Sequence, residues 1–308
     1  MQHKDVLVTG GSGFIGSHLV KSLSKANAVQ ILDTTSPDSL PVGVSYHEGD
    51  IRNLRTVAAL AKGKDVIFHL AAMVDVADSI ADPLRAHAVN DTGTINVLEA
   101  ARQHDCRVVM ASSAAVYGEP TMTPIPETHP LEPTSPYGLQ KLTGDHAARM
   151  YADLYDLPSV VLRYFNVYGP GQKHGHYAGV IETFLSQAQS DQELCIFGDG
   201  QQTRDFIHVK DVVRANERAA TADITGKSFN IGTGNAVTIG ELAAKIRTHC
   251  DSKSQIVYSD KRDGDIRHSR ADTDRAVDEL GFKATIDLNE GLKTLTDGVT
   301  AFANRGNV

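Results

Sequence analysis

Cysteine is scarce in this sequence of 308 residues, which has three: Cys106, Cys195 and Cys250. Their wide and unpaired spacing argues against a disulfide framework and against a zinc site. No apolar run reaches the roughly 18 residues of a membrane-spanning helix. No apolar signal core follows the first few polar residues either. We therefore expect a cytoplasmic protein without a membrane segment.

Positive charge is also in short supply. The sequence has 30 Lys and Arg against 38 Asp and Glu, so its formal net charge is -8 and its pI is near 5.9. An acidic protein is not generally attracted to nucleic acid or to an anionic membrane, and we expect neither as a partner. A chain of 308 residues is long enough for two lobes or for one large α/β domain.

A short apolar run at residues 5–9 leads directly into a glycine-rich stretch, Gly10 to Gly16, and then into apolar residues at helical spacing. This order predicts a phosphate-binding turn, because bare backbone admits a pyrophosphate and a helix N-terminus supplies amide donors. The next apolar run ends at Asp33, twenty residues after Gly13, where a ribose-binding carboxylate belongs. Residues 34–38 carry no cation for a 2′-phosphate, which favours NAD over NADP.

Strand-like and helical stretches alternate further along the chain. We expect strands near 44–47, 65–70 and 107–110, and helices over about 53–62 and 83–104. Small residues, Ala71 and Ala72, follow one of these strands and leave room for a ligand at the sheet edge. The strand at 107–110 delivers Ser112 and Ser113 to the same edge.

Tyr137 and Lys141 form a candidate catalytic pair. If Pro136 opens a helix, the two residues are i and i+4 neighbours on one face. A tyrosine acting as a base near pH 7 needs its pKa lowered by roughly three units, about 4 kcal/mol, and a fixed cation nearby is a suitable cause. Taken alone, such a pair is more often a solvated helix face, so its meaning depends on the upstream motifs.

Together, these motifs resemble the extended short-chain dehydrogenase/reductase family, and in particular its UDP-sugar 4-epimerase branch. The resemblance rests on the glycine turn, the acid after the second strand, Ser112–Gly118, the Tyr137-x-x-x-Lys141 pair and Leu162–Asn166. It implies an α/β fold with a doubly wound parallel sheet, the Rossmann fold. An NAD-binding domain would span 1–165, and a smaller C-terminal nucleotide-sugar lobe would span 166–308, partly interleaved with the first.

The resemblance also implies roles for single residues. Ser113, Tyr137 and Lys141 would be catalytic: Tyr137 takes the proton of the sugar 4-hydroxyl while hydride moves to NAD, Ser113 hydrogen-bonds the oxygen, and Lys141 lowers the tyrosine pKa. The 4-keto sugar would then rotate and accept the hydride on its other face. The implied cofactor-binding residues are Gly10, Gly13, Phe14, Ile15, Gly16, Asp33, Asp50, Ile51, Leu70, Ala71, Ala72, Asn90, Tyr137, Lys141 and Tyr164.

Residues after Ser113 help to distinguish epimerases from their relatives. Related 4,6-dehydratases carry an Asp-Glu pair there and UDP-glucuronate decarboxylases a Glu, whereas this chain has Ala114 and Ala115. We therefore expect oxidation and re-reduction without elimination. Glu119 and Glu127 lie in the same loop region, and we interpret them as solvated carboxylates. Another NAD-dependent nucleotide-sugar enzyme (a decarboxylase, a dehydratase or a net-redox reductase) and a non-catalytic NAD-binding protein remain as alternatives.

The second half resembles the family's substrate lobe. Arginines suit a diphosphate, so Arg204 and Arg262 are the candidates for it, with Asn166 assisting and Phe197 beside the uracil. Ser269 stands where glucose-restricted epimerases have a bulky tyrosine and where forms that accept N-acetylhexosamines have a small residue. We therefore expect UDP-GlcNAc and UDP-GalNAc to be accepted alongside UDP-glucose and UDP-galactose.

Two further expectations concern metal and assembly. His174 and His176 lie in a glycine-rich stretch and favour a mobile loop over the substrate, since a metal site would need further ligands. No metal is expected. The helices near 83–104 and 137–155 suit the four-helix homodimer interface usual in the family.

Overall fold

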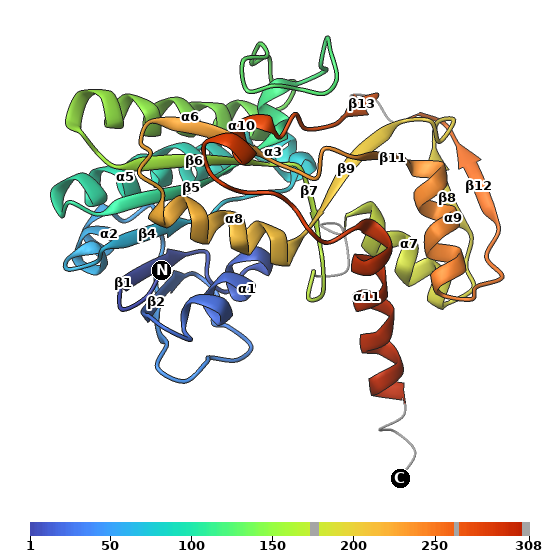
Figure 1. Cartoon of the computed structure of the whole chain (residues 1–308), viewed down its shortest axis with the longest axis horizontal. Helices are drawn as coiled ribbons and strands as arrows, with labels where there is room; N and C mark the ends of the chain where they lie inside the picture. Colours follow the sequence, from blue (N-terminus) through green and yellow to red (C-terminus); the bar gives the residue numbers. More distant parts are fainter. Residues whose placement is uncertain (173–178, 262–264, 304–308) are drawn as a thin grey trace.

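The computed structural model describes residues 1–172, 179–261 and 265–303. Figure 1 shows a large α/β body on the left and a smaller lobe on the right, joined by long strands and connections. His174 and His176, which bear on the metal expectation, lie outside the described residues. Among the residues described, no helix is both long and apolar enough to cross a bilayer.

Seven strands form the central sheet, in the order β10-β6-β5-β4-β1-β2-β3, and all neighbours are parallel. Their buried apolar runs explain why both faces are covered. The chain order reverses between β1 and β4, and open sheets bind ligands at the carboxyl ends beside such a point. The strands are β1 (Asp5–Thr9), β2 (Ala28–Asp33), β3 (Ser45–Glu48), β4 (Val66–His69), β5 (Arg107–Ser113), β6 (Ser159–Tyr164) and β10 (Lys227–Ile231).

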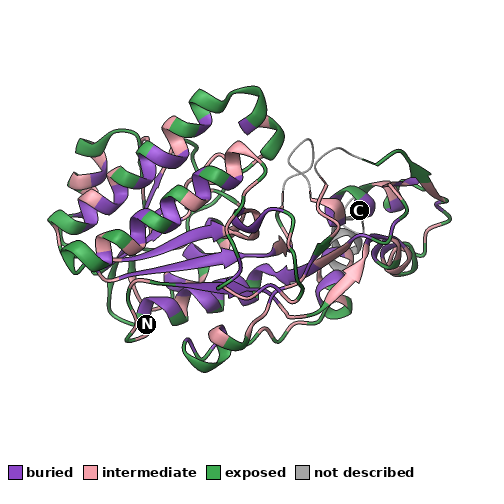
Figure 2. Ribbon diagram, turned by 90° about the horizontal axis from the view of Figure 1, so that it is seen from above, coloured by how far each residue is buried: buried purple, intermediate pink, exposed green. Residues whose placement is uncertain are grey.

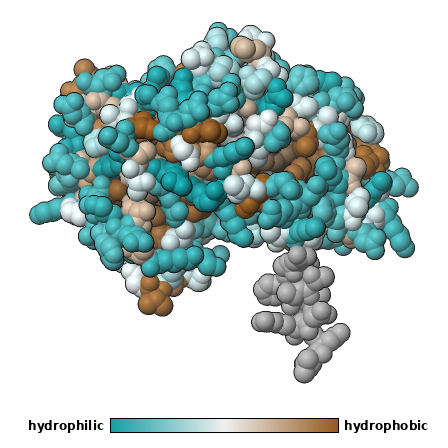
Figure 3. Space-filling view, in the orientation of Figure 1, coloured by the Kyte–Doolittle hydropathy of each residue, from teal (hydrophilic) through white to brown (hydrophobic). Residues whose placement is uncertain are grey.

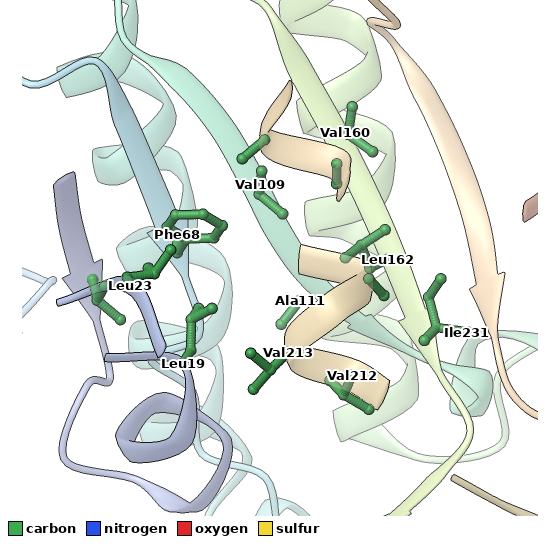
Figure 4. Close-up of a cluster of buried hydrophobic side chains, with 14 of the residues drawn as sticks. Leu19, Leu23, Phe68, Val109, Ala111, Val160, Leu162, Val212, Val213 and Ile231 are labelled. Atoms are coloured by element: carbon green, nitrogen blue, oxygen red, sulfur yellow. The ribbon is translucent and has the colours of Figure 1, made fainter. Parts of the chain in front are cut away.

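Helices cover both faces of this sheet, and the strands between them are buried (Figure 2). Side chains of α1 and α8 meet the sheet on one face, as Leu19, Leu23 and Val212 do in Figure 4. Helices α2, α5 and α6 pack on the other face. Each fully buried Leu or Val contributes about 1.5–3 kcal/mol. The bounds are α1 (Phe14–Leu23), α2 (Leu54–Ala61), α5 (Gly93–Gln103), α6 (Pro136–Tyr155) and α8 (Val209–Thr221).

The helix expected over 83–104 is not a regular α-helix. It consists of α4 (Pro83–His87), a π-helical turn η1 (Ala88–Thr92) and α5, and it follows the short helix α3 (Val76–Ala81). The π turn directs Asn90 inward to buried hydrogen-bond partners. Such turns are often found at functional sites, and apolar spacing alone does not reveal them. Similarly, β5 is longer than expected because Ser112 and Ser113 still pair with β6.

The smaller lobe has its own apolar core. Strand β9 carries β11, β13 and β7 as neighbours, and β8 pairs with β12. The chain returns to the large body in α8 and β10, so the C-terminal half completes the first sheet; a division at residue 165 stays a prediction. The bounds are β7 (Asn166–Tyr168), α7 (Val180–Gln189), β8 (Leu194–Phe197), β9 (Thr203–His208), β11 (Ala236–Thr238), α9 (Ile239–His249), β12 (Ile256–Ser259), β13 (His268–Ser269), α10 (Asp274–Asp278) and α11 (Leu288–Ala303).

Candidate functional site

A cavity of about 790 Å³ opens at the carboxyl ends of the central strands. It extends from the glycine-rich turn before α1, past the ends of β2 and β3, to the first turn of α6. The fold thus gathers residues from strands β2, β5, β6 and β7, from helices α1, α4 and α6, and from the loops after β1, β3 and β4 at one site. The expected site residues that line it are Gly10, Gly13, Phe14, Ile15, Gly16, Asp33, Asp50, Ile51, Leu70, Ala71, Ala72, Ser113, Tyr137, Lys141 and Tyr164.

The glycine-rich turn presents backbone to the cavity. Gly10 has a φ of 74°, in the left-handed region that favours glycine. A Cβ on Gly16 would lie 2.1 Å from the Gly10 carbonyl oxygen, so no side chain fits at this point. Helix α1 starts at Phe14 without a side-chain cap, and its first-turn amides have no helical acceptors. This end of the cavity can therefore hold a phosphate.

Asp33 ends β2 beside that turn. Its Oδ2 accepts a hydrogen bond from Ser12 N at 3.0 Å, and its Oδ1 accepts one from Thr35 N at 3.1 Å. A carboxylate has further lone pairs, which can accept ribose hydroxyls. In the described part of the chain the Ser12 Oγ atom is buried without a hydrogen-bond partner, and a bound ligand could satisfy it.

Arg52 is a cavity residue that the sequence analysis missed. It follows Asp50, donates to Asp50 Oδ2 through Nε at 2.9 Å and Nη2 at 2.6 Å, and lines the cavity together with Thr34 and Thr35. These hydrogen bonds hold the pKa of Asp50 below its ordinary value. Residues 34–38 carry no cation, as expected, but the neighbouring strand β3 brings one to the same end of the cavity.

Asn90 lies behind the cavity wall rather than in it. Its Oδ1 accepts from Met73 N at 2.8 Å, and its Nδ2 donates to Met73 O at 2.9 Å and to Gln140 Oε1 at 2.8 Å. Gln140 precedes Lys141 in α6. Asn90 therefore fixes the wall after β4 relative to the helix that carries Tyr137 and Lys141.

A buried histidine that the sequence analysis did not single out supports the same wall. The Thr94 hydroxyl donates to Asn90 O, so its oxygen accepts from His69 Nε2 at 3.0 Å. Nδ1 of His69 then accepts from the Thr9 hydroxyl at 2.8 Å, and Thr9 Oγ1 accepts from Ala71 N at 3.4 Å. Burial lowers the pKa of His69 to about 3, which keeps the ring neutral. In the sequence, the available signal for this supporting role was a single histidine in an apolar strand.

The first turn of α6 positions the catalytic candidates. Ser135 caps the helix by accepting from Gly138 N at 3.1 Å, and Pro136 occupies the first turn as expected. A Cβ on Gly138 would lie 2.7 Å from Ala115 O, so glycine permits the close approach of α6 to the end of β5. Ser113, at that end, accepts from Ala115 N at 3.1 Å and keeps its proton for another acceptor.

The pKa shifts of the pair differ from the expectation. Burial raises the pKa of Tyr137, and a hydrogen bond with Ser113 acts in the opposite direction. Burial lowers the pKa of Lys141 to about 8. Lys141 Nζ lies 5.9 Å from the Tyr137 ring centroid and donates to Ala111 O at 3.1 Å. In the protein without cofactor, burial of the phenol therefore sets the direction of its pKa shift, and the lowering of the tyrosine pKa by Lys141 stays a prediction.

The two glutamates in the loop after Ser113 have structural contacts. Glu127 is buried and accepts from Asn230 N at 2.8 Å, and burial raises its pKa. The interpretation of Glu127 as a solvated carboxylate was wrong, because the edge of β10 covers it. Glu119 accepts from Arg267 N at 3.2 Å. Neither glutamate lines the cavity. The carboxylates that line it in the described chain are Asp33 and Asp50, which lie at the end away from Ser113.

Four of the expected substrate residues, Asn166, Phe197, Arg204 and Ser269, belong to the smaller lobe and do not line this cavity. Ser269 on β13 is the register partner of Arg204 on β9, and Asn166 Nδ2 donates to Asp205 O at 3.1 Å. Phe197 ends β8, and its carbonyl accepts from Gln202 Nε2 at 2.7 Å. Arg204 is ion-paired with Asp265, which an anionic ligand would have to displace. Arg262 lies outside the described residues.

The burial of Tyr164 completes the cavity wall from β6. Its hydroxyl is hydrogen-bonded to Asn216 Oδ1 at 3.0 Å, and burial raises its pKa. No group of three or more His, Cys, Asp or Glu able to hold a metal ion is found within residues 1–172, 179–261 and 265–303. The glycine cradle, the seated Asp33 carboxylate and the unpaired Ser12 hydroxyl fit a dinucleotide.

Comparisons with known proteins agree with this site. Residues 6–232 match the model of the NAD dependent epimerase/dehydratase family. A putative UDP-glucose 4-epimerase of Methanocaldococcus jannaschii is 39% identical over 299 residues, which cover 95% of this chain and 97% of that protein. A UDP-N-acetyl-alpha-D-glucosaminuronate decarboxylase of Bacillus cytotoxicus is 35% identical over 271 residues, 83% of each chain.

A solved structure extends the comparison to three dimensions. The UDP-N-acetylglucosamine 4-epimerase of Methanobrevibacter ruminantium M1, in complex with UDP-N-acetylmuramic acid, superimposes with a TM-score of 0.91 at 35% identity. The match covers 97% of this chain and 100% of that one. The dinucleotide cradle therefore serves NAD, and the chain belongs to the NAD dependent epimerase/dehydratase family.

Proposed function

We propose that this protein is a UDP-hexose 4-epimerase that interconverts UDP-glucose and UDP-galactose, and also UDP-GlcNAc and UDP-GalNAc. The observation that carries the proposal is the grouping of Ser113, Tyr137 and Lys141 at the end of the cofactor cavity, next to Ala114 and Ala115. This grouping can move a proton at one hydroxyl, and among the described lining residues no carboxylate lies beside it to drive elimination.

Each catalytic side chain has one task. Tyr137 Oη accepts the proton of the sugar 4-hydroxyl and later returns it. The Ser113 hydroxyl donates to the same oxygen and orients it, while Lys141 supplies positive charge beside the phenol. When bound, NAD supplies a reversible hydride acceptor and a positive charge that favours the phenolate. The wall that Asn90 fixes holds this end of the cavity in place.

The nucleotide part of the substrate belongs to the smaller lobe in this proposal. Arg204 would exchange Asp265 for the diphosphate, with Arg262 as the second cation and Asn166 assisting. Phe197 would lie beside the uracil. Ser269 is small, which would leave space near the sugar 2-substituent, and it pairs with Arg204 across the two strands. The relatives named above act on, or bind, UDP-sugars with and without an N-acetyl group.

The test is to incubate the purified protein separately with UDP-galactose and UDP-GalNAc and to follow both products and NADH absorbance. Conversion of both without accumulated NADH is the expected result. Turnover of UDP-galactose alone would contradict the role of Ser269. Net NADH formation would point instead to a reductase or dehydrogenase, and release of carbon dioxide from a UDP-uronate would point to a decarboxylase. Conversion of none of these substrates would contradict the proposed reaction.

Two properties of the whole protein are part of the proposal. A homodimer formed through α4, α5 and α6 would cover exposed apolar side chains on these helices, including Leu84, Leu139 and Leu154. A cytoplasmic location would suit an enzyme acting on nucleotide sugars. Both remain predictions, and the first is tested below.

A further inference from the structure

The Asp33 carboxylate is seated on two backbone donors. Ser12 N and Thr35 N reach its two oxygens at 3.0 Å and 3.1 Å, so each oxygen is fixed by one N–H group. Backbone donors that converge in this way bind any small anion of suitable size. A phosphate oxygen would therefore be accepted where the carboxylate now lies, provided that the carboxylate were gone.

Arg52 provides a cation at the same end of the cavity. Both hydrogen bonds of its guanidinium go to one oxygen, Asp50 Oδ2, and within the described chain its Nη1 has no hydrogen-bond partner. The Arg52 side chain is 50% exposed and that of Asp50 is 30% exposed. An exposed pair of this kind contributes little to stability, so Arg52 can turn from Asp50 to another anion.

The sheet brings together the segments that carry these groups. Strands β2 and β3 are parallel neighbours, and Gly49 N donates to Asp33 O at 3.0 Å, one residue before Asp50. Thr34, Thr35 and Arg52 line the same cavity. The other lining cations in the described chain, Arg85 and Lys141, come from α4 and α6. Among these lining cations of the described chain, Arg52 is thus the one that follows β3, the strand next to the strand of Asp33.

We propose that the position now occupied by the Asp33 carboxylate is a latent subsite for a ribose 2′-phosphate, with Ser12 N, Thr35 N and Arg52 as its ligands. Two carboxylates keep it closed: Asp33 occupies the backbone donors and Asp50 neutralises Arg52. A phosphate dianion is repelled by both, whereas ribose hydroxyls can donate to Asp33. The preference for NAD thus depends on the Asp50–Arg52 pair as well as on Asp33. This inference rests on the cofactor site and not on the proposed sugar reaction.

Nucleotide binding by three variants tests the subsite. Asp33→Ser vacates the two backbone donors, Asp33→Ser/Arg52→Gln also removes the cation, and Asp33→Ser/Arg55→Gln is the matched control. Arg55 lies in the first turn of α2, is exposed and does not line the cavity. Nucleotide released on denaturation is identified by chromatography. Calorimetry with 2′,5′-ADP and 5′-ADP then gives the affinity ratio at two salt concentrations.

We expect the wild type to carry NAD and to bind 5′-ADP better than 2′,5′-ADP. Asp33→Ser should shift the ratio towards 2′,5′-ADP by about tenfold or more, as charge-assisted hydrogen bonds replace repulsion. Arg52→Gln in that background should remove most of the gain and weaken its salt dependence, whereas Arg55→Gln should keep both.

Two results would overturn the proposal. The first is an equal affinity for 2′,5′-ADP in the Arg52→Gln and Arg55→Gln double variants, which would show that Arg52 is not a ligand. The second is no shift towards 2′,5′-ADP on replacing Asp33. If Asp33→Ser does not fold, Asp33→Ala, which likewise frees both N–H groups, is measured in the same way and subject to the same criterion.

Discussion

At the scale of single residues, burial favours the neutral forms of both Tyr137 and Lys141. Replacing Tyr137 by Phe removes the hydroxyl that exchanges the proton and leaves the ring in place. We expect turnover to fall by about 10²–10⁴-fold, the range for loss of a general base. The measurement is the rate of UDP-galactose conversion, with the NAD content of the purified variant as control. Wild-type turnover with normal NAD content would contradict the assignment.

Buried histidines give a second prediction, for stability in acid. Burial lowers the pKa of His69 to about 3 and that of His208 to about 4. Because the unfolded chain binds these protons from about pH 6.5 downward and the folded chain does not, stability is lost as the pH falls. Each histidine contributes a slope of about 1.4 kcal/mol per pH unit.

Urea unfolding between pH 6.5 and pH 4.5 measures this slope. His69→Gln should reduce it by about 1.4 kcal/mol per unit, and the contribution of His208 should remain. An unchanged slope would mean that His69 is protonated in the folded state. The carboxylates whose pKa is lowered, such as Asp50 and Asp199, lose their stabilising effect only at lower pH.

Most of the cofactor-binding residues expected from the sequence line the cavity, because they lie in short motifs whose chemistry is local. The glycine turn and Asp33 are examples, since strand, turn and acid follow one another at fixed spacing. Arg52 and His69 were not predicted. Their roles depend on which strands become neighbours, and the spacing of one segment carries no such information. Desolvation of Tyr137 likewise depends on the completed fold.

At the scale of elements, Gly138 determines how closely α6 approaches β5. In Gly138→Ala the new Cβ would meet Ala115 O at 2.7 Å and Pro133 Cβ at 3.0 Å, which pushes Tyr137 away from Ser113. Displacements of about 1 Å can cost about 100-fold in rate, so we expect turnover to fall at least tenfold. Gly240→Ala in α9 is the control, since its closest contact would be 3.4 Å. Equal activity of both variants would contradict this role.

The π turn η1 gives a prediction for cofactor retention. Asn90→Ala leaves Met73 N and Gln140 Oε1 without their buried partner, which should cost about 1–3 kcal/mol and loosen the cavity wall. The NAD content of the purified variant should fall. Asn53→Ala, which removes the cap of α2, should destabilise the fold by about 1 kcal/mol and leave NAD content unchanged. Equal NAD content in both variants would count against a role for the π turn.

Element positions were mostly predictable, because apolar runs and helical spacing reflect burial directly. The strand at 5–9 has the expected bounds, and the next strand ends at Asp33 as expected. The interruption of the helix at 88–92 was not predictable, since a π turn is stabilised by tertiary hydrogen bonds of Asn90 rather than by local pattern. The extension of β5 to Ser113 has a similar cause, because pairing with β6 continues beyond its apolar run.

At the scale of the whole molecule, the larger body contains segments from both halves of the chain. Strand β10 and helix α8 leave the C-terminal half and pack on the large sheet, where Phe229 and Val212 are fully buried. The face in Figure 3 is mostly hydrophilic, with apolar residues in small groups. Exposed apolar residues also occur on α3, α4 and α6, where Ile80 and Leu84 are 62% and 81% exposed.

These exposed residues lead to a prediction of assembly. Met150 and Leu154 lie four residues apart on α6, so they can contribute to one apolar stripe, and Ile80 on α3 and Leu84 on α4 are exposed as well. Monomers rarely leave such stripes uncovered, which favours a symmetric dimer built on the same helices of two chains. Light scattering should give twice the chain mass of 33.1 kDa.

Charge placed in the interface separates this prediction from incidental exposure. Leu154, which is 64% exposed, becomes buried in the proposed dimer, so Leu154→Lys should shift the mass towards that of the monomer. Val42→Lys is the control, because Val42 is 99% exposed in the loop before β3 and takes no part in the interface. A monomeric wild type would contradict the dimer outright. A dimer unaffected by Leu154→Lys would place the interface on another face, since a buried and unpaired ammonium cannot be accommodated at little cost.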